Sequence, residues 1–129
     1  SRTRKENKMA GTRPGGAQHF TVQEAQNTTL GQVGSMYNDG TSAMTPPTDH
    51  VFIAITFITD TTFDSSGGLI AVDSDRFINT EAASNPGTGG SGGVALDNGN
   101  TFPAGVTIYG RWTEIDPASG SGLIAYIGK

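Results

Sequence analysis

The sequence predicts a single all-β domain, of β-sandwich or jelly-roll-like type, at residues 19–129, preceded by an extended basic arm at residues 1–18. A chain of 129 residues has room for one domain rather than two. It holds 19 glycine, 17 threonine and 10 serine residues, and only 16% of its residues are charged, which is unlike a helical protein. Its apolar residues fall into short β-branched segments between frequent turn signals, without a long amphipathic helix.

The arm differs from the rest of the chain in both charge and composition. Its basic side chains are Arg2, Arg4, Lys5, Lys8 and Arg13. They oppose one acidic residue, so residues 1–18 carry a charge of +4, whereas residues 19–129 carry −8. The arm contains glycine and proline and almost no large apolar side chain, so it cannot build a core of its own. We predict that its five basic residues contact another subunit; the alternative is that the arm folds back on its own acidic body.

Runs of alternating or β-branched residues predict the strands of the body. In chain order these runs cover residues 19–22, 28–37 as a weaker run, 51–58, a segment that begins at Phe63, 69–72, 76–80, 106–115 and 123–127. The run at 51–58, VFIAITFI, is apolar on both faces, so it is predicted to be a central strand that is covered on each side. Residues 116–122 are predicted to form the hairpin loop before the last strand.

Residues 82–101 form the longest predicted connection and include the glycine-rich stretch NPGTGGSGG. A loop of that length is uncommon in a compact domain and tends to be functional or to reach a neighbour. Ser91 in this loop formally matches the Gly-x-Ser-x-Gly motif of hydrolases. That motif requires a strand before the serine and a helix after it, and neither is predicted here, so no nucleophile is expected.

Other candidate chemical groups also favour a structural interpretation. The chain has no cysteine, which excludes thiol catalysis and Cys-ligated metals. His19 and His50 each stand at the entrance of a strand, without spacing that supports a metal site. The aspartates considered as calcium ligands are Asp60, Asp64, Asp73 and Asp75. They lack the loop pattern of a calcium site, so turn capping explains them better. We predict no catalytic residue, no metal site and no cofactor, and a protein that is not an enzyme.

Tyr109 and Trp112 are the predicted subunit contacts of the body. Alternation along residues 106–115 places the even-numbered residues on one face of the strand and the odd-numbered residues on the other. Trp112 therefore points away from Arg111, and it is interpreted as either a core residue or a subunit contact. The body shows no basic face and no interleaving of aromatic and basic residues, which argues against nucleic acid as a partner.

The longest strongly apolar run, residues 51–58, is too short to cross a bilayer as a helix. The chain also opens without the charged and then apolar pattern of a signal peptide. Together with the lack of cysteine, these observations predict a soluble protein made in the cytoplasm, with no membrane partner.

Residues 102–128, FPAGVTIYGRWTEIDPASGSGLIAYIG, resemble the C-terminal signature of small virion structural proteins of tailed bacteriophages, especially those of marine cyanobacteria. The segment KMAGTRPGG in the arm and the strand VFIAITFI are also similar to that group, so the resemblance touches about half of the chain. It implies a virion component that is made in the cytoplasm of a host bacterium, and it brings no catalytic residues with it.

The charge division and the resemblance together lead us to expect a capsid decoration or cement protein. Its arm and β-domain would contact the major capsid protein or other virion subunits and stabilise the shell, and it would form a homo-oligomer, with a trimer favoured. The alternative is a host-recognition knob or fibre tip that binds a surface glycan or receptor through loop 82–101 and solvent-facing aromatic side chains. A carbohydrate-active or nucleic-acid-binding domain without a virion role is a third possibility.

Overall fold

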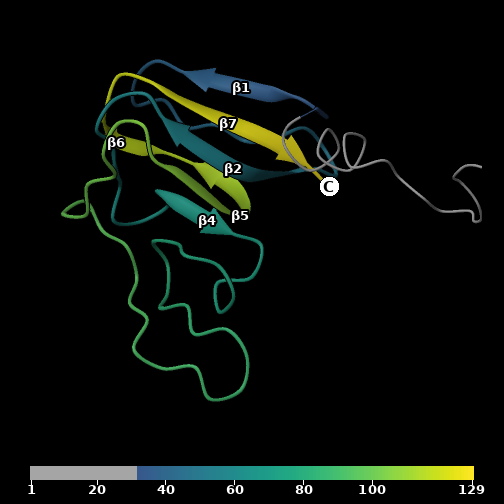
Figure 1. The fold of residues 1–129 in the computed structure, drawn as a ribbon, viewed down its shortest axis with the longest axis vertical. Coiled ribbons are helices and arrows are strands. Elements are labelled where there is room, and N and C mark those ends of the chain that lie inside the picture. The colour runs from purple at the N-terminus through teal and green to yellow at the C-terminus, as the bar shows by residue number, and fades with distance from the viewer. Residues whose placement is uncertain (1–31) are drawn as a thin grey trace, which may run out of the picture.

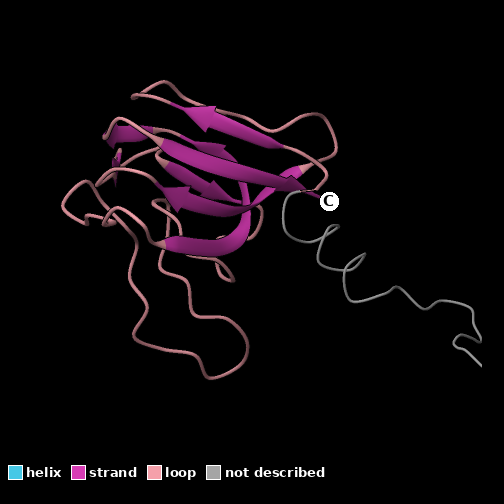
Figure 2. Cartoon of the chain, turned by 45° about the horizontal axis from the view of Figure 1, so that its top comes forward, coloured by secondary structure: helices cyan, strands magenta, loops and turns pink. Residues whose placement is uncertain are grey.

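A computed structural model describes residues 32–129, and these residues form an all-β fold, as predicted. The described part contains seven strands and no helix (Figure 2). The strands are β1 (Ser35–Asn38), β2 (Val51–Phe57), β3 (Thr62–Phe63), β4 (Leu69–Ala71), β5 (Thr107–Ile115), β6 (Pro117–Ser119) and β7 (Leu123–Gly128). The arm, with its five predicted contact residues, and the strand predicted at 19–22 lie outside the described residues.

Five of the strands form one antiparallel sheet in the order β1-β7-β2-β5-β4 (Figure 1). β2 lies at its centre, as its apolar sequence predicted, with β7 on one side and β5 on the other. β3 and β6 form a separate two-stranded sheet whose residues Phe63 and Pro117 are buried. Phe63 belongs to the same core as the large sheet, so the described body has two very unequal layers.

The hydrophobic core lies on one face of the five-stranded sheet. Its side chains are Met44, Phe52, Ile55, Phe57, Phe63, Leu69, Trp112, Ile115, Leu123, Ala125 and Ile127. Full burial of a large apolar side chain stabilises the folded state by about 1.5–3 kcal/mol. Because the core draws on β2, β3, β4, β5 and β7, its burial holds both layers together.

The opposite face of the sheet has no second layer of described residues over it, which corrects the prediction that β2 is covered on each side. Ala54 and Thr56 of β2 point to this face, where they pair with Tyr109 and Thr107 of β5. Ala54 is only 3% exposed, yet Tyr109 beside it is 67% exposed. The small side chain is therefore covered by longer ones of its own sheet rather than by a second layer of described residues.

Two register shifts in β5 correct the alternation predicted along residues 106–115. One shift lies opposite β2 and the other opposite β4. A bulge adds one residue to a strand and so changes which face the following residues occupy. Ile115 consequently points into the core together with Trp112, although simple alternation placed the two on opposite faces.

Gly110 lies within the register shift of β5 opposite β2 and leaves room for the indole of Trp112. A Cβ atom at this position would lie 2.5 Å from Cζ2 of Trp112, closer than van der Waals contact allows. The indole Nε1 in turn donates a hydrogen bond to the carbonyl oxygen of Ile78 at 2.8 Å. The tryptophan thus links the centre of the sheet to the loop that follows β4.

Residues 76–80 form turns and loop rather than the predicted strand. The reason is Asn79, whose side chain satisfies four backbone groups while only 1% of the residue is exposed. Its Nδ2 donates to two carbonyl oxygens at 2.9 and 2.7 Å, and its Oδ1 accepts from the N–H groups of Glu81 and Ala82, each at 2.8 Å. These local bonds hold a compact loop and override the β propensity of the sequence.

Residues 82–101 form a long loop without a strand or helix, as predicted, and Figure 1 shows it reaching beyond the β4 edge of the sheet. The loop is tied to the core near its end. Leu96 donates its N–H to the carbonyl oxygen of Asn79 at 2.9 Å, and the ring of Phe102 stacks on Phe57 with centroids 5.0 Å apart. By contrast, the loop predicted at 116–122 contains β6, because these residues pair with β3.

Candidate functional site

All three tyrosines of the chain lie on the side of the five-stranded sheet that is opposite the core. Tyr109 and Tyr126 both pair with Ala54, and Tyr37 pairs with the residue two positions before Tyr126, so strand register places the three rings on one face. We call this side of the sheet the open face. Tyr37 and Tyr109 are 61% and 67% exposed. Tyrosine combines an apolar ring with a polar tip and is therefore common at binding surfaces.

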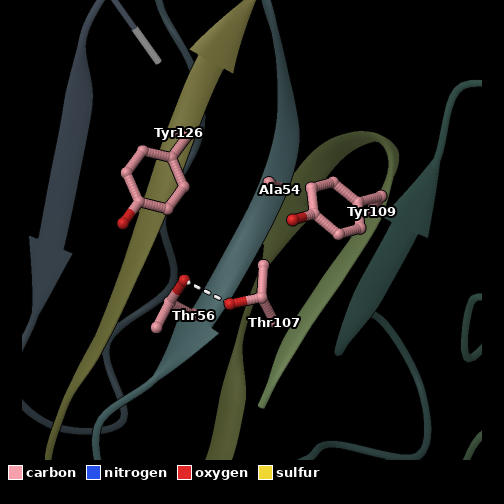
Figure 3. A pocket seen from close by; sticks show the side chains of 5 residues that line it. All are labelled: Ala54, Thr56, Thr107, Tyr109 and Tyr126. Atoms are coloured by element: carbon pink, nitrogen blue, oxygen red, sulfur yellow. Dashed lines mark hydrogen bonds between the residues drawn. The ribbon is translucent and has the colours of Figure 1, made fainter. Parts of the chain in front are cut away.

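A shallow hollow of about 260 Å³ lies on the open face (Figure 3). Its lining residues are Ala54, Thr56, Thr107, Tyr109 and Tyr126. The hollow arises because the short side chain of Ala54, on the central strand β2, lies between two long ones, Tyr109 on β5 and Tyr126 on β7. Adjacent strands are spaced about 4.8 Å apart, so the two tyrosine backbones stand about 9.6 Å apart with only the small side chain between them.

The polar groups of the hollow are all hydroxyl groups. The Oγ1 atoms of Thr56 and Thr107 lie 2.8 Å apart and form a hydrogen bond across β2 and β5 (Figure 3). One hydroxyl donates to the other, so the pair keeps one O–H to donate and several lone pairs to accept. No charged side chain lines the hollow, so the site can form hydrogen bonds and apolar contacts but no ion pair.

The structure separates the two predicted body contacts. Tyr109 is exposed on the open face and is free to contact another molecule, so its role as a subunit contact stays a prediction. Trp112 is 0% exposed and belongs to the core, the first of its two interpretations. A side chain without exposed surface cannot touch another subunit, so the assignment of Trp112 as a contact residue is wrong.

The predicted turn-capping role fits Asp73, whose Oδ1 accepts a hydrogen bond from the N–H of Asp75 at 3.0 Å. Asp60 instead links two distant segments, because its Oδ1 accepts a hydrogen bond from the N–H of Ala104 at 2.9 Å. In residues 32–129 there is no group of three or more histidine, cysteine or acidic side chains that could hold a metal ion.

Asp116 is a further acidic residue with a perturbed environment. Partial burial, the negative charge of Asp64, a hydrogen bond with Asp64 and the charge of Glu114 raise its pKa above the usual value of 3.8. The two aspartates lie where β3 and β6 meet, since the N–H of Asp64 donates to the carbonyl oxygen of Asp116. Asp116 is therefore a local source of pH dependence, and it lies outside the hollow.

The remaining described candidates, Ser91 and His50, do not line the hollow. Ser91 is exposed within loop 82–101, and the described residues around it form neither a strand nor a helix. His50 Nδ1 lies 2.8 Å from the carbonyl oxygen of Thr48, within its own turn. His19 and the five basic residues of the arm lie outside the described residues.

Sequence reasoning missed four of the five residues that line the hollow: Ala54, Thr56, Thr107 and Tyr126. Alternation within each strand could have placed Thr107 beside Tyr109 on one face, and Ala54 beside Thr56. It could not have shown that these two pairs lie next to each other, because β2 and β5 are 50 residues apart and their register depends on a bulge.

Comparison with protein families, with characterised proteins and with solved structures finds nothing that matches this chain. Among residues 32–129, no helix has the length and apolar character needed to cross a membrane.

Proposed function

We propose that this protein is a structural component of a tailed-phage particle, a decoration protein that binds the shell through its arm. The observation that carries the proposal is the division of charge. Residues 1–18 carry +4, whereas the described residues hold three basic and ten acidic side chains, a net charge of −7. A basic segment attracts acidic surfaces, whereas an acidic body repels them. This division is expected when the arm, and not the body, binds an acidic surface of a neighbouring subunit. The resemblance of residues 102–128 to virion proteins supports the same function.

The first described strand, β1, lies at one edge of the five-stranded sheet. The carbonyl oxygen of Gly34 accepts a hydrogen bond from the N–H of Ile127 at 2.8 Å, so the start of β1 lies beside the end of β7. Ser35 of β1 pairs with Tyr126, so the start of β1 borders the hollow, whereas loop 82–101 lies beyond the β4 edge of the sheet (Figure 1). The proposed shell contacts are the basic side chains of residues 1–18, and none of them lines the hollow as the described residues form it.

Deleting residues 1–17 tests the proposal and leaves the described core intact, because the core side chains among residues 32–129 all belong to residues 44–127. Particles of the phage that encodes this chain are stripped of it, or made without it, and are then incubated with either the full chain or the truncated chain. Bound protein is counted by quantitative mass spectrometry and located by electron cryomicroscopy. We expect the full chain to bind in many copies, one at each repeated shell position, and the truncated chain to be absent from the particles.

Circular dichroism and the fluorescence of Trp112 show whether the truncated body is folded, so failure to bind is distinguished from failure to fold. Full occupancy of the particles by a folded, truncated chain would refute the proposal. A few copies confined to one vertex or to the tail would favour the host-recognition alternative instead.

A charge variant sharpens the test because it keeps the arm at its full length. The five basic residues of the arm are replaced by glutamine, and the matched control replaces Arg76 and Arg111 of the body by glutamine. We expect particle binding to fall at least tenfold in the arm variant and to be retained in the control. Binding by the wild-type chain should also weaken as the salt concentration rises, because screening shortens the reach of charge attraction.

A further inference from the structure

We propose that the hollow on the open face binds a neutral saccharide, with the rings of Tyr109 and Tyr126 and the hydroxyl groups of Thr56 and Thr107 as the binding groups. This inference goes beyond shell attachment and does not depend on it. It also gives Tyr109 a partner different from the sister subunit that the sequence predicted. The shape, the polar groups and the charge of the hollow each favour such a ligand.

The two tyrosines supply apolar surface on either side of a small floor. Sugar rings have faces made of C–H groups, which pack against aromatic rings in the same way as other apolar surfaces. Figure 3 shows the rings of Tyr126 and Tyr109 on opposite sides of Ala54, one on β7 and the other on β5. A larger residue than alanine at this position would fill the space between the two rings.

The hydroxyl groups of the hollow match the hydroxyl groups of a sugar. A hydroxyl both donates and accepts, so a cluster of hydroxyls has no fixed polarity and pairs best with a ligand of the same kind. Thr56 and Thr107 are held in place by their mutual 2.8 Å bond, which orients the remaining lone pairs and proton. No hydrogen bond joins the tyrosine hydroxyls to the other residues drawn around the hollow (Figure 3). The other lining residues therefore do not engage their tips.

The charge of the site favours a neutral ligand. The hollow has no basic side chain to attract an anion and no carboxylate to hold a cation. The described residues as a whole carry a net charge of −7, which repels anionic ligands at long range. A neutral hexose, deoxyhexose or N-acetylhexosamine satisfies both conditions, whereas a sulfated or acidic sugar does not.

The size of the hollow limits what it can hold. Its volume of about 260 Å³ lies below the range of about 300–1,000 Å³ that is typical of sites for drug-sized ligands. One sugar unit is the group that fits, either alone or as part of a longer glycan that continues along the open face. Few contacts and an open rim predict weak binding of a single unit, with a dissociation constant of about 1 mM, which corresponds to about −4 kcal/mol.

The experiment is a titration of the full chain, labelled with ¹⁵N and with ¹³C at methyl groups, followed by NMR. The probes are glucose, galactose, mannose, rhamnose, N-acetylglucosamine and N-acetylgalactosamine, with glucuronic acid as the acidic comparison. We expect at least one neutral probe to shift the methyl signals of Ala54, Thr56 and Thr107 in a saturable way. Glucuronic acid should bind at least tenfold more weakly than that probe.

Variants identify the hollow as the place of binding. Tyr109→Ala and Tyr126→Ala should each weaken binding at least tenfold. Tyr37→Ala is the matched control, since it removes a tyrosine from the same open face but outside the hollow, and it should change the affinity by less than twofold. Thr56→Val removes one hydroxyl at nearly constant shape and should also weaken binding.

Three results would overturn the proposal. The first is that none of the neutral probes shifts the signals of the hollow. The second is that binding occurs but survives in the Tyr109→Ala and Tyr126→Ala variants while their spectra show a folded body. The third is that the signals of the hollow shift with protein concentration in the absence of sugar, which would show that a second copy of the chain covers this face.

Discussion

Replacing Asn79 by alanine removes four hydrogen bonds from a buried side chain and tests how the loop after β4 is held. Two carbonyl oxygens lose the Nδ2 donor, and two N–H groups lose the Oδ1 acceptor. A typical intramolecular hydrogen bond contributes about 0.5–1.5 kcal/mol to stability, so four of them predict a loss of about 2–6 kcal/mol. That is a large part of the about 5–15 kcal/mol by which domains are stable.

The free energy of unfolding is measured by urea denaturation, followed through the fluorescence of Trp112. This is the single tryptophan of the chain, and its Nε1 binds the carbonyl oxygen of Ile78, directly before the mutated residue. The matched control is Asn98→Ala, at an exposed position in the following loop, which should change stability by no more than about 0.5 kcal/mol. A loss below about 1 kcal/mol for Asn79→Ala, or one equal to that of the control, would refute the reasoning.

If the alanine variant is too unstable to purify, Asn79→Asp gives the same information. Its carboxylate can still accept from the N–H groups of Glu81 and Ala82, but it faces two carbonyl oxygens without a proton to donate. Because protonation restores one donor, we expect this variant to be closer to the wild type in acid than at neutral pH. A pH-independent difference would contradict the assigned role of the Nδ2 group.

Two further substitutions test the packing and the charge of the body. Gly110→Ala places a Cβ atom 2.5 Å from the indole of Trp112 and should destabilise the fold by about 1–3 kcal/mol. Its control is Gly40→Ala, where the added Cβ atom has nothing within 4 Å. Equal effects of the two substitutions on the melting temperature would contradict the assigned packing of Gly110 against Trp112. Burial and the charge of Asp64 raise the pKa of Asp116, so the folded state binds this proton more tightly than the unfolded chain, and stability is lost as pH rises through that pKa. Asp116→Asn lacks this loss, so its advantage in melting temperature should grow from acid to neutral pH, and an advantage independent of pH would count against the pairing with Asp64.

The strongest sequence pattern predicted its structural position well. The run at 51–58 is apolar at nearly every residue, a pattern that only a central strand can bury, and β2 lies at the centre of the sheet. The pattern did not reveal that one of its faces is open. Ala54 looks like a core residue in the sequence, but tyrosines from β5 and β7 cover it instead of a second layer.

Predictions failed where a few specific hydrogen bonds or bulges override local preference. Residues 76–80 have the composition of a strand, yet one buried amide at Asn79 holds them as a loop. Ile115 changes face because β5 contains register shifts that depend on its partner strands. The hollow was missed for the same reason, since it joins three strands whose pairing register cannot be read from any one of them.

The two proposals become linked if particles carry the body in many copies. A site with a dissociation constant of about 1 mM is too weak to hold one protein on a glycan, but linked sites gain about 10²–10⁴ in overall affinity when several engage together. The shell contacts are proposed for the basic residues 1–18 and the sugar contacts for the lining of the hollow, so the two functions use different side chains of each copy. Particles bearing the wild-type chain should therefore bind an immobilised glycan that contains the best neutral probe, and particles bearing Tyr109→Ala should not. Because both particles keep the arm, equal occupancy with unequal glycan binding would separate the function of the open face from that of residues 1–18.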